Sequence, residues 1–154
     1  MNQLSLLNGT WLLGHCNDDP VRPHLSIQFR TSSGREVYAL EDEETGIIQA
    51  IVCVAYTNEV PTTEHELDLY SQQACNDGQH GDHAIFYTIW SYAPGAGREL
   101  INVLWDYLKE NKPVKRFVTL SPRTDMARKF HFRNGAFELQ DNLETTNYEY
   151  SDAT

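Results

Sequence analysis

Two apolar segments separated by an acidic turn dominate the first half of the chain. Glu36–Leu40 and Ile47–Thr57 lie on either side of Glu41–Glu44, which predicts a β-hairpin whose second strand is long enough to be central in a sheet. Upstream, Leu25–Phe29 alternates apolar and polar side chains and predicts a strand with one face in water. Leu4–Leu13 is short and apolar and predicts no definite structure.

The rest of the first half carries weaker signals. Asn17–Pro23 is rich in turn-forming residues. Thr62–Tyr70 has weak helical spacing, with Thr62 or Thr63 as its N-cap. Cys75–Asp82, rich in Asn, Gly, Gln, His and Asp, predicts a loop.

The second half alternates strands and helices more regularly. The predicted elements are a strand at Ala84–Trp90, a helix at Glu99–Asn111, a strand at Arg116–Leu120, a helix at Thr124–Arg133, and final strands at Phe137–Leu139 and Thr146–Tyr150. The first helix ends before Pro113, because the residue preceding a proline is displaced from the helical region. Gly135 ends the second helix. The order predicts an α/β protein without internal repeats or linkers.

Length and composition narrow the class of protein. A chain of 154 residues predicts a single domain covering residues 1–154, which would bury about two-thirds of its unfolded surface. Cys16, Cys53 and Cys75 share no metal-ligand or redox spacing, which favours a reducing compartment. No segment approaches the roughly 20 apolar residues that a bilayer demands, and the N-terminus does not combine a basic start with an apolar run. We therefore expect a soluble, cytoplasmic protein with no membrane partner.

The charge distribution bears on the class of ligand. A formal charge of −10 argues against nucleic-acid binding, because Lys and Arg dominate affinity for phosphate polymers. Residues 1–82 hold 3 basic and 13 acidic side chains, whereas residues 83–154 hold 9 of each. The second half therefore suits a small phosphorylated ligand. Alternatively, Lys109, Lys112, Lys115 and Arg116 are a solvated helix end whose cations complement its dipole.

A Gly-rich turn follows the strand Ala84–Trp90. Its residues are Pro94, Gly95, Ala96, Gly97 and Arg98. The free N–H groups and partial positive charge of a helix start would bind a diphosphate there, because the two glycines leave the backbone bare and Arg98 adds a cation. The alternative is a plain strand-to-helix turn that uses glycine for its dihedral angles. Neither a Walker motif nor a complete Rossmann spacing follows, so a nucleoside triphosphatase or dinucleotide dehydrogenase has no support.

Several segments, in order, resemble one enzyme family. They are Ala84–Ile89, Gly97-x-x-Leu100-x-Asn102-x-Leu104, Phe117–Pro122 and Phe130-His131-x-x-Asn134-Gly135-Ala136, with weaker similarity at Val52–Pro61 and Asn147–Tyr150. Over residues 36–150 they resemble the catalytic domain of malonyl-coenzyme A decarboxylase, without that family's helical N-terminal domain. The resemblance implies the GNAT (Gcn5-related N-acetyltransferase) acyl-CoA fold: a central mixed, mostly antiparallel sheet flanked by helices, with the pyrophosphate of acyl-coenzyme A at the Gly-rich turn.

The resemblance also implies an activity and a site. The substrate would be a coenzyme A thioester, and the reaction the decarboxylation of malonyl-CoA or a related malonyl thioester. Ser121 and His131 would form the catalytic pair, with Tyr148 lining the same pocket. Ser121 would hold the departing carboxylate or the oxyanion, and His131, with an ordinary pKa near 6.5, would supply a proton to the α-carbon. Alternatively, Ser121 lies in an ordinary strand-to-loop break and His131 on a helix surface.

Three departures from the family leave the acyl group open. Cys53 stands where the family strand has a carboxylate, Leu143 follows Asn142 where the family has tryptophan, and the segment before the final strand is shorter.

Two other functions stay open. One is acetyl transfer from acetyl-CoA to an amine, with Tyr148 or Tyr150 as the acid and the acidic tip Glu41–Glu44 attracting a cationic acceptor. The other is a non-catalytic acyl-CoA-binding or partner-binding module, which the loss of the carboxylate at Cys53 favours. The sequence does not determine whether the chain forms a homo-oligomer.

We expect no metal cofactor. His80 and His83 lie on either side of Asp82 in a Gly- and Asn-rich loop, but no third ligand is near in the sequence.

Overall fold

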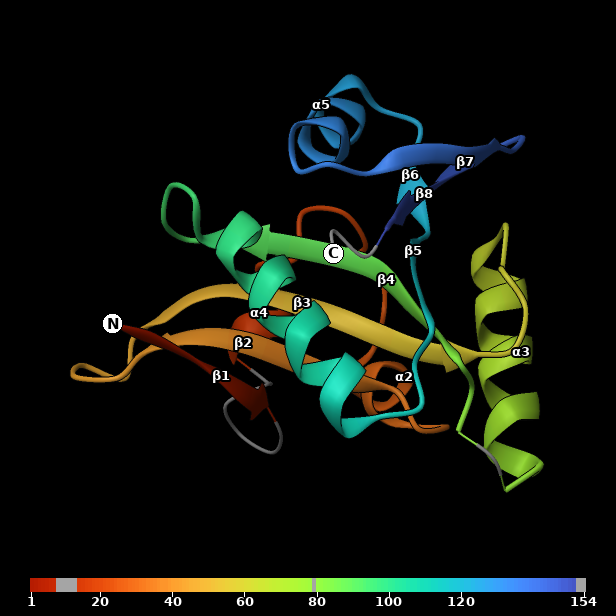
Figure 1. Cartoon of the computed structure of the whole chain (residues 1–154), viewed down its shortest axis with the longest axis horizontal. Coiled ribbons are helices and arrows are strands. Elements are labelled where there is room, and N and C mark those ends of the chain that lie inside the picture. The colour runs from red at the N-terminus through yellow and green to blue at the C-terminus, as the bar shows by residue number, and fades with distance from the viewer. Residues whose placement is uncertain (8–13, 79, 152–154) are drawn as a thin grey trace.

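The structure is a computed structural model that describes residues 1–7, 14–78 and 80–151. Its centre is a sheet with the strand order β1-β2-β3-β4-β5-β8-β6, and β7 pairs with β8 (Figure 1). Neighbouring strands are antiparallel except for β4 and β5, which are parallel. The predicted mixed, mostly antiparallel sheet flanked by helices is therefore confirmed.

From β2 onward the elements follow the predicted order, with β6 as an additional short strand. The strands are β1 (Asn2–Leu7), β2 (Glu36–Asp42), β3 (Ile48–Thr57), β4 (His83–Ser91), β5 (Arg116–Thr119), β6 (Ser121–Pro122), β7 (Phe137–Asp141) and β8 (Thr145–Tyr150), and the helices are α2 (Ile27–Thr31), α3 (Glu64–Asn76), α4 (Ala96–Asn111) and α5 (Asp125–Arg133). The predicted hairpin is β2 and β3. The β1 strand occupies the start of the apolar stretch Leu4–Leu13, and residues 8–13 of that stretch lie outside the described residues.

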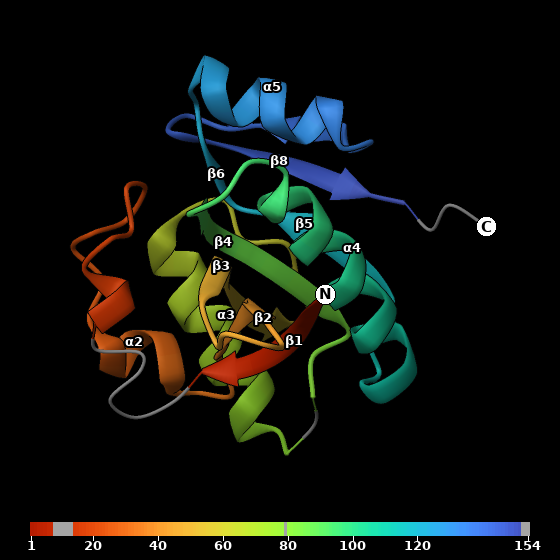
Figure 2. The same cartoon turned by 90° about the vertical axis from the view of Figure 1, so that its left-hand side faces the viewer.

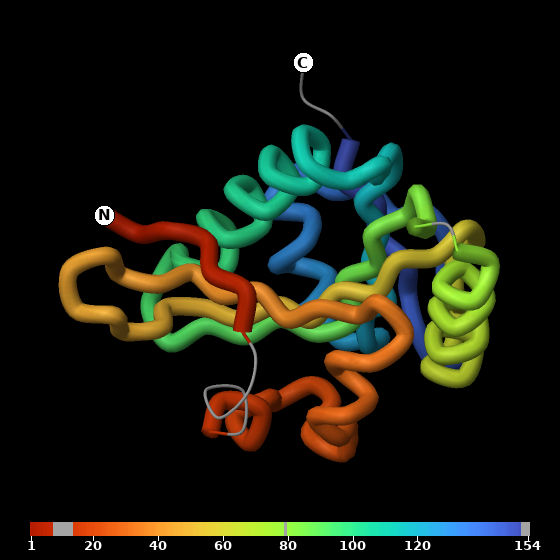
Figure 3. The backbone as a smooth tube through the Cα atoms, turned by 90° about the horizontal axis from the view of Figure 1, so that it is seen from below, coloured from red at the N-terminus to blue at the C-terminus, as the bar shows by residue number. Residues whose placement is uncertain are grey.

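Strand β3 explains why helices cover both faces of the sheet. Its side chains alternate between two cores: Val52 and Val54 pack in the cluster that contains Leu104 of α4, whereas Ile51 and its neighbours on the other face pack with Leu67 of α3. A strand that is apolar on both faces must be covered on both. Figures 2 and 3 show α4 on one side of the sheet and α2 on the other.

Side-chain caps define two helix starts as the sequence predicts. Thr63 Oγ1 accepts a hydrogen bond from Glu66 N at 3.0 Å, and Thr124 Oγ1 accepts one from Ala127 N at 3.2 Å. Helix α4 starts at Ala96, earlier than the predicted Glu99, because Gly95 adopts a φ of 77° and serves as its N-cap. Helix α3 continues to Asn76, so the predicted loop at Cys75–Asp82 was placed two residues too early.

The strand predicted at Leu25–Phe29 is wrong. The chain forms helix α2 there, and Ser26 Oγ caps it by accepting from Phe29 N at 3.0 Å. Leu25 and Phe29 are four residues apart, a spacing that also fits one face of a helix, so the pattern in this short segment fits both structures. The helix carries Arg30 into a fully buried ion pair with Asp19, which a half-exposed strand would not require.

Among the described residues, none of the helices has the length and apolar character needed to cross a bilayer.

Candidate active site

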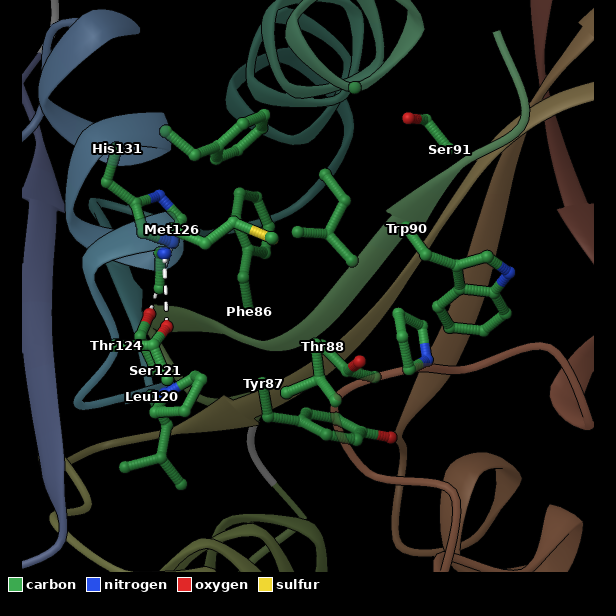
Figure 4. Close-up of a pocket in the computed structure, with 17 residues that line it drawn as sticks. Phe86, Tyr87, Thr88, Trp90, Ser91, Leu120, Ser121, Thr124, Met126 and His131 are labelled. Carbon is green, nitrogen blue, oxygen red and sulfur yellow. Dashed lines mark hydrogen bonds between the residues drawn. The ribbon is translucent and has the colours of Figure 1, made fainter.

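Strands β4 and β5 separate after a short paired stretch and leave a cavity between them. Their pairing runs over four residue pairs, from His83 with Arg116 to Phe86 with Thr119. Beyond it, the second half of β4, the start of α4, β6 and α5 line a cavity of about 310 Å³ (Figure 4). Pro20 of the N-terminal segment closes one wall.

Ser121 and His131 meet at one end of this cavity. Ser121 is the first residue of β6, and His131 is buried in the last turn of α5. Ser121 Oγ lies 3.2 Å from His131 Nε2, and both side chains line the cavity. Figure 4 shows the pair at one end and Trp90 and Ser91 at the other. The sequence named both residues, and the structure brings them into hydrogen-bond contact.

The neighbouring hydroxyls define the direction of the hydrogen bonds. Ser121 Oγ donates to Thr119 Oγ1 at 2.8 Å, so Ser121 must accept from His131 Nε2–H. His131 Nδ1 is then an acceptor, and Tyr150 Oη lies 2.6 Å from it as the donor. Burial raises the pKa of Tyr150, which keeps its hydroxyl protonated. The result is a continuous donor chain from Tyr150 through His131 to Ser121.

Burial also makes the imidazole neutral. Desolvation lowers the pKa of His131 from 6.5 to about 4. The expectation of an ordinary pKa near 6.5 is therefore wrong, because the sequence does not show how deeply the last turn of α5 is covered. At neutral pH His131 acts as a hydrogen-bond donor at Nε2 and carries no charge.

Tyr148 and Tyr150 have different positions beside this histidine. The ring of Tyr148 stacks on the imidazole, with centroids 4.9 Å apart. However, Tyr148 lines a second, polar cavity of about 340 Å³ next to Arg123 and Arg128, and not the cavity that contains Ser121. Tyr150, which the sequence linked only to the transferase alternative, makes the hydrogen bond to the imidazole.

The Gly-rich turn reaches the same cavity from the other side. Gly97, in the first turn of α4, lines the cavity, and a Cβ added there would lie 3.3 Å from the ring of Phe130 on α5. Glycine therefore allows α4 to approach α5 closely. Arg98 is exposed at this helix start, where first-turn N–H groups have no partner within the helix.

The cavity lining carries no charge near neutral pH. Its described lining residues include no Lys, Arg, Asp or Glu, and its histidine is neutral. Most of the lining is apolar, with Phe86, Ile89 and Leu120 between the two ends. The polar side chains there are neutral hydrogen-bonding groups.

A charged network lies behind β4, and sequence reasoning missed it. Asp19 accepts from Thr88 Oγ1 at 2.8 Å and from Arg30 Nη1 at 2.8 Å, and the ion-paired side chains are completely buried. Arg30 Nη1 also lies 3.4 Å from Sγ of Cys53, whose pKa burial raises to about 12. Cys53 is thus a neutral thiol beside Arg30, and the carboxylate paired with Arg30 belongs to Asp19. The turn-rich character of Asn17–Pro23 was the only sequence signal.

The loop histidines form no metal site in the part of the chain that the structure describes, where no three His, Cys, Asp or Glu side chains gather around a common point. His80 Nδ1 instead bonds to the Gly81 carbonyl at 2.8 Å.

Comparison with known proteins identifies the fold. No family model and no curated protein matches the chain. The GphF GNAT-like decarboxylase in complex with isobutyryl-CoA aligns with a TM-score of 0.72 and 12% identity, over 97% of this chain and 98% of that one. Arabidopsis thaliana NAA60 in complex with acetyl-CoA aligns with a TM-score of 0.59 and 11% identity, over 97% and 98% of the two chains.

Malonyl-CoA decarboxylase from Cupriavidus metallidurans aligns with a TM-score of 0.56 and 23% identity, over 85% of this chain. The chain spans only 33% of that enzyme's length. At these identities the similarities establish the fold, which is that of the GNAT acyltransferases.

Proposed function

We propose that this chain is an acyl-coenzyme A-utilising enzyme that decarboxylates malonyl-CoA, or a related malonyl thioester, to the acetyl thioester. The observation that carries the proposal is the combination of a Ser121–His131–Tyr150 donor chain with a cavity lining that has no charged side chain. The fold supports it, because two decarboxylases align with this chain.

An uncharged cavity suits loss of carbon dioxide. The reaction moves the charge of a carboxylate into a thioester enolate, so a lysine or arginine beside the carboxylate would stabilise the starting state. An apolar lining gives the carboxylate no such partner. When substrate binds, the Ser121 hydroxyl would turn from Thr119 Oγ1 to the thioester oxygen and stabilise the charge that develops there, while His131 Nε2–H continues to donate to Ser121 Oγ.

The same donors complete the reaction. Cleavage of the bond between the carboxylate and the α-carbon leaves its electron pair in the enolate and releases carbon dioxide. Ser121, with its hydroxyl turned from Thr119 to the substrate, then delivers its proton to the α-carbon and takes a proton from His131 Nε2. Tyr150 in turn gives its phenol proton to His131 Nδ1, and water restores the phenol. The product is the acetyl thioester, with one hydrogen derived from solvent.

The Gly-rich turn would hold the coenzyme. A diphosphate at the N-terminus of α4 would meet the free N–H groups of Gly97 and Arg98 and the Arg98 guanidinium. Since Gly97 and Ser121 line one cavity, a thioester bound this way would extend from the turn toward Ser121.

Amine acetylation is the less favoured alternative. A transferase needs a base, or a water path, to deprotonate its amine. The described lining offers no carboxylate for that task, and the only imidazole has a pKa of about 4.

The test is turnover of malonyl-CoA without any acceptor. We expect acetyl-CoA to form, detected by mass spectrometry, with one deuterium incorporated when the reaction is run in D2O. Ser121→Ala should lower kcat at least about 100-fold. Ser5→Ala, on the far edge strand β1, is the matched control and should leave kcat unchanged.

Intact malonyl-CoA and methylmalonyl-CoA after prolonged incubation at high enzyme concentration would contradict the proposal. Release of thiol from acetyl-CoA only after an amine is added would identify a transferase. Thermal stabilisation by coenzyme A without either reaction would identify a binding module.

A further inference from the structure

The point where β4 and β5 separate leaves two backbone carbonyls in need of donors. The last bond between the strands runs from Leu120 N to Phe86 O at 2.8 Å. The next carbonyls, of Tyr87 on β4 and Leu120 after β5, belong to buried residues and have no strand partner across the gap. A buried carbonyl without a donor costs about 1–3 kcal/mol, so something must supply those bonds.

One side chain supplies both. Arg22 donates from Nε to Tyr87 O and from Nη2 to Leu120 O, each at 2.7 Å. Its third group, Nη1, donates to Glu64 Oε1 at 2.9 Å, and the side chain is only 8% exposed. The guanidinium therefore spans the gap between the strands and is itself held by a carboxylate of α3.

We propose that Arg22 is a positioning residue that fixes the distance between β4 and β5 and, through it, the place of Ser121. Leu120, whose carbonyl it holds, directly precedes Ser121 in the chain, and Tyr87 and Leu120 both line the cavity. The planar fork of Arg22 sets the separation of the two carbonyls at one value, because its two donors keep a constant spacing. A shift of Ser121 would alter its 3.2 Å contact with His131.

Lysine cannot reproduce this arrangement. Its ammonium is a compact charge on a flexible stem, without two parallel donors at a constant spacing. Arg22→Lys therefore keeps the positive charge beside Glu64 but loses the constraint between the strands.

Arg35 provides a matched control. It is also a buried arginine that bonds to a carbonyl and a carboxylate: Nε donates to Phe29 O at 2.6 Å, and Nη1 donates to Asp68 at 2.9 Å. None of its partners lines the cavity. Arg35→Lys should lower the melting temperature, as Arg22→Lys should, and leave the site intact.

The experiment compares the two lysine variants by kinetics and by NMR. We expect Arg22→Lys to lower kcat for malonyl-CoA about 10- to 100-fold with KM within about threefold of wild type, because misplacement of a catalytic group acts on the chemical step. Arg35→Lys should keep kcat. The ring nitrogen signals of His131 should shift in Arg22→Lys and stay unchanged in Arg35→Lys. Guanidinium ion should partly restore kcat to Arg22→Ala.

The kinetic arm rests on the proposed function, whereas the NMR arm does not. If wild type turns over no malonyl thioester, the proposed function fails and the His131 signals still decide the role of Arg22. Wild-type kcat and unshifted His131 signals in Arg22→Lys would overturn the inference, as would equal shifts in both lysine variants.

Discussion

Two polar networks lie on opposite sides of β4, and they differ in charge. On the cavity side, Ser121, His131 and Tyr150 are joined by hydrogen bonds between neutral groups. On the far side, Asp19 and Arg30 form an ion pair with no exposed side-chain surface. Both networks are buried, so burial alone does not explain why one is charged and the other is not.

The difference in charge reflects which hydrogen-bonding and charged groups surround the titratable side chain of each network. Burial raises the pKa of Asp19, but hydrogen bonds from the backbone of Arg22, from Arg30 and from Thr88 outweigh it and hold that pKa below 3.8. His131 has hydroxyl partners and no carboxylate, so desolvation dominates and the ring stays neutral. The charged network anchors the N-terminal segment, and the neutral one offers donors to the cavity without a countercharge.

The largest effect is expected from breaking the charged network. Asp19→Asn keeps the size of the side chain but leaves Arg30 as a buried, unpaired cation, which should cost about 3–5 kcal/mol of unfolding free energy. Urea unfolding followed by fluorescence measures the loss. Asp77→Asn, at an exposed position after α3, should change stability by less than about 0.5 kcal/mol. A loss below about 1 kcal/mol for Asp19→Asn would show that the ion pair does not anchor the segment.

The two networks should lose their contributions to stability in different ranges of acid pH. The folded-state pKa of His131 is about 4, below its ordinary value of 6.5, so the unfolded chain binds more protons between these values. The stability from burying the neutral ring is complete above pH 6.5, and roughly 3 kcal/mol is lost as the pH falls to 4. Asp19 adds a further loss only below its ordinary value of 3.8, as the pH falls through its depressed pKa.

The difference between wild type and His131→Asn in urea unfolding between pH 7 and pH 4 measures this contribution. The variant should show a flatter dependence, whereas His65→Asn, on the exposed side of α3, should follow wild type. Equal pH dependence in wild type and His131→Asn would mean that the ring is not held neutral by burial.

The sequence predicted the elements that have strong periodic patterns. The hairpin β2–β3 and helix α4 follow from apolar positions, because β3 must be buried on both faces and α4 on one. Ser121 and His131 were found through the family resemblance. His131 lies on the predicted helix α5, whereas Ser121 lies in β6, a strand that was not predicted. A periodic pattern records which face of a helix or strand is buried, so it locates regular elements well.

The rest of the site depends on contacts between distant parts of the chain. Arg22 bonds to carbonyls 65 and 98 residues away, and no local pattern marks an arginine for such a role. Helix α2 was missed because its one turn is stabilised by a cap at Ser26 and by the burial of Arg30. The pKa of His131 was wrong for the same reason, since desolvation depends on what covers the ring.

The smallest effect should come from removing one hydroxyl of the neutral network. Tyr150→Phe keeps the ring that packs on His131 and removes the donor to Nδ1. Without that donor, Nδ1 competes for the ring proton and the Nε2–H tautomer is less favoured, so kcat for malonyl-CoA should fall about tenfold, or about 1.4 kcal/mol. Tyr107→Phe, at an exposed position on α4, is the control. The ring nitrogen signals report the tautomer directly: an unchanged tautomer with reduced kcat would show that Tyr150 acts on the reaction by another route, and an unchanged kcat would remove Tyr150 from the donor chain.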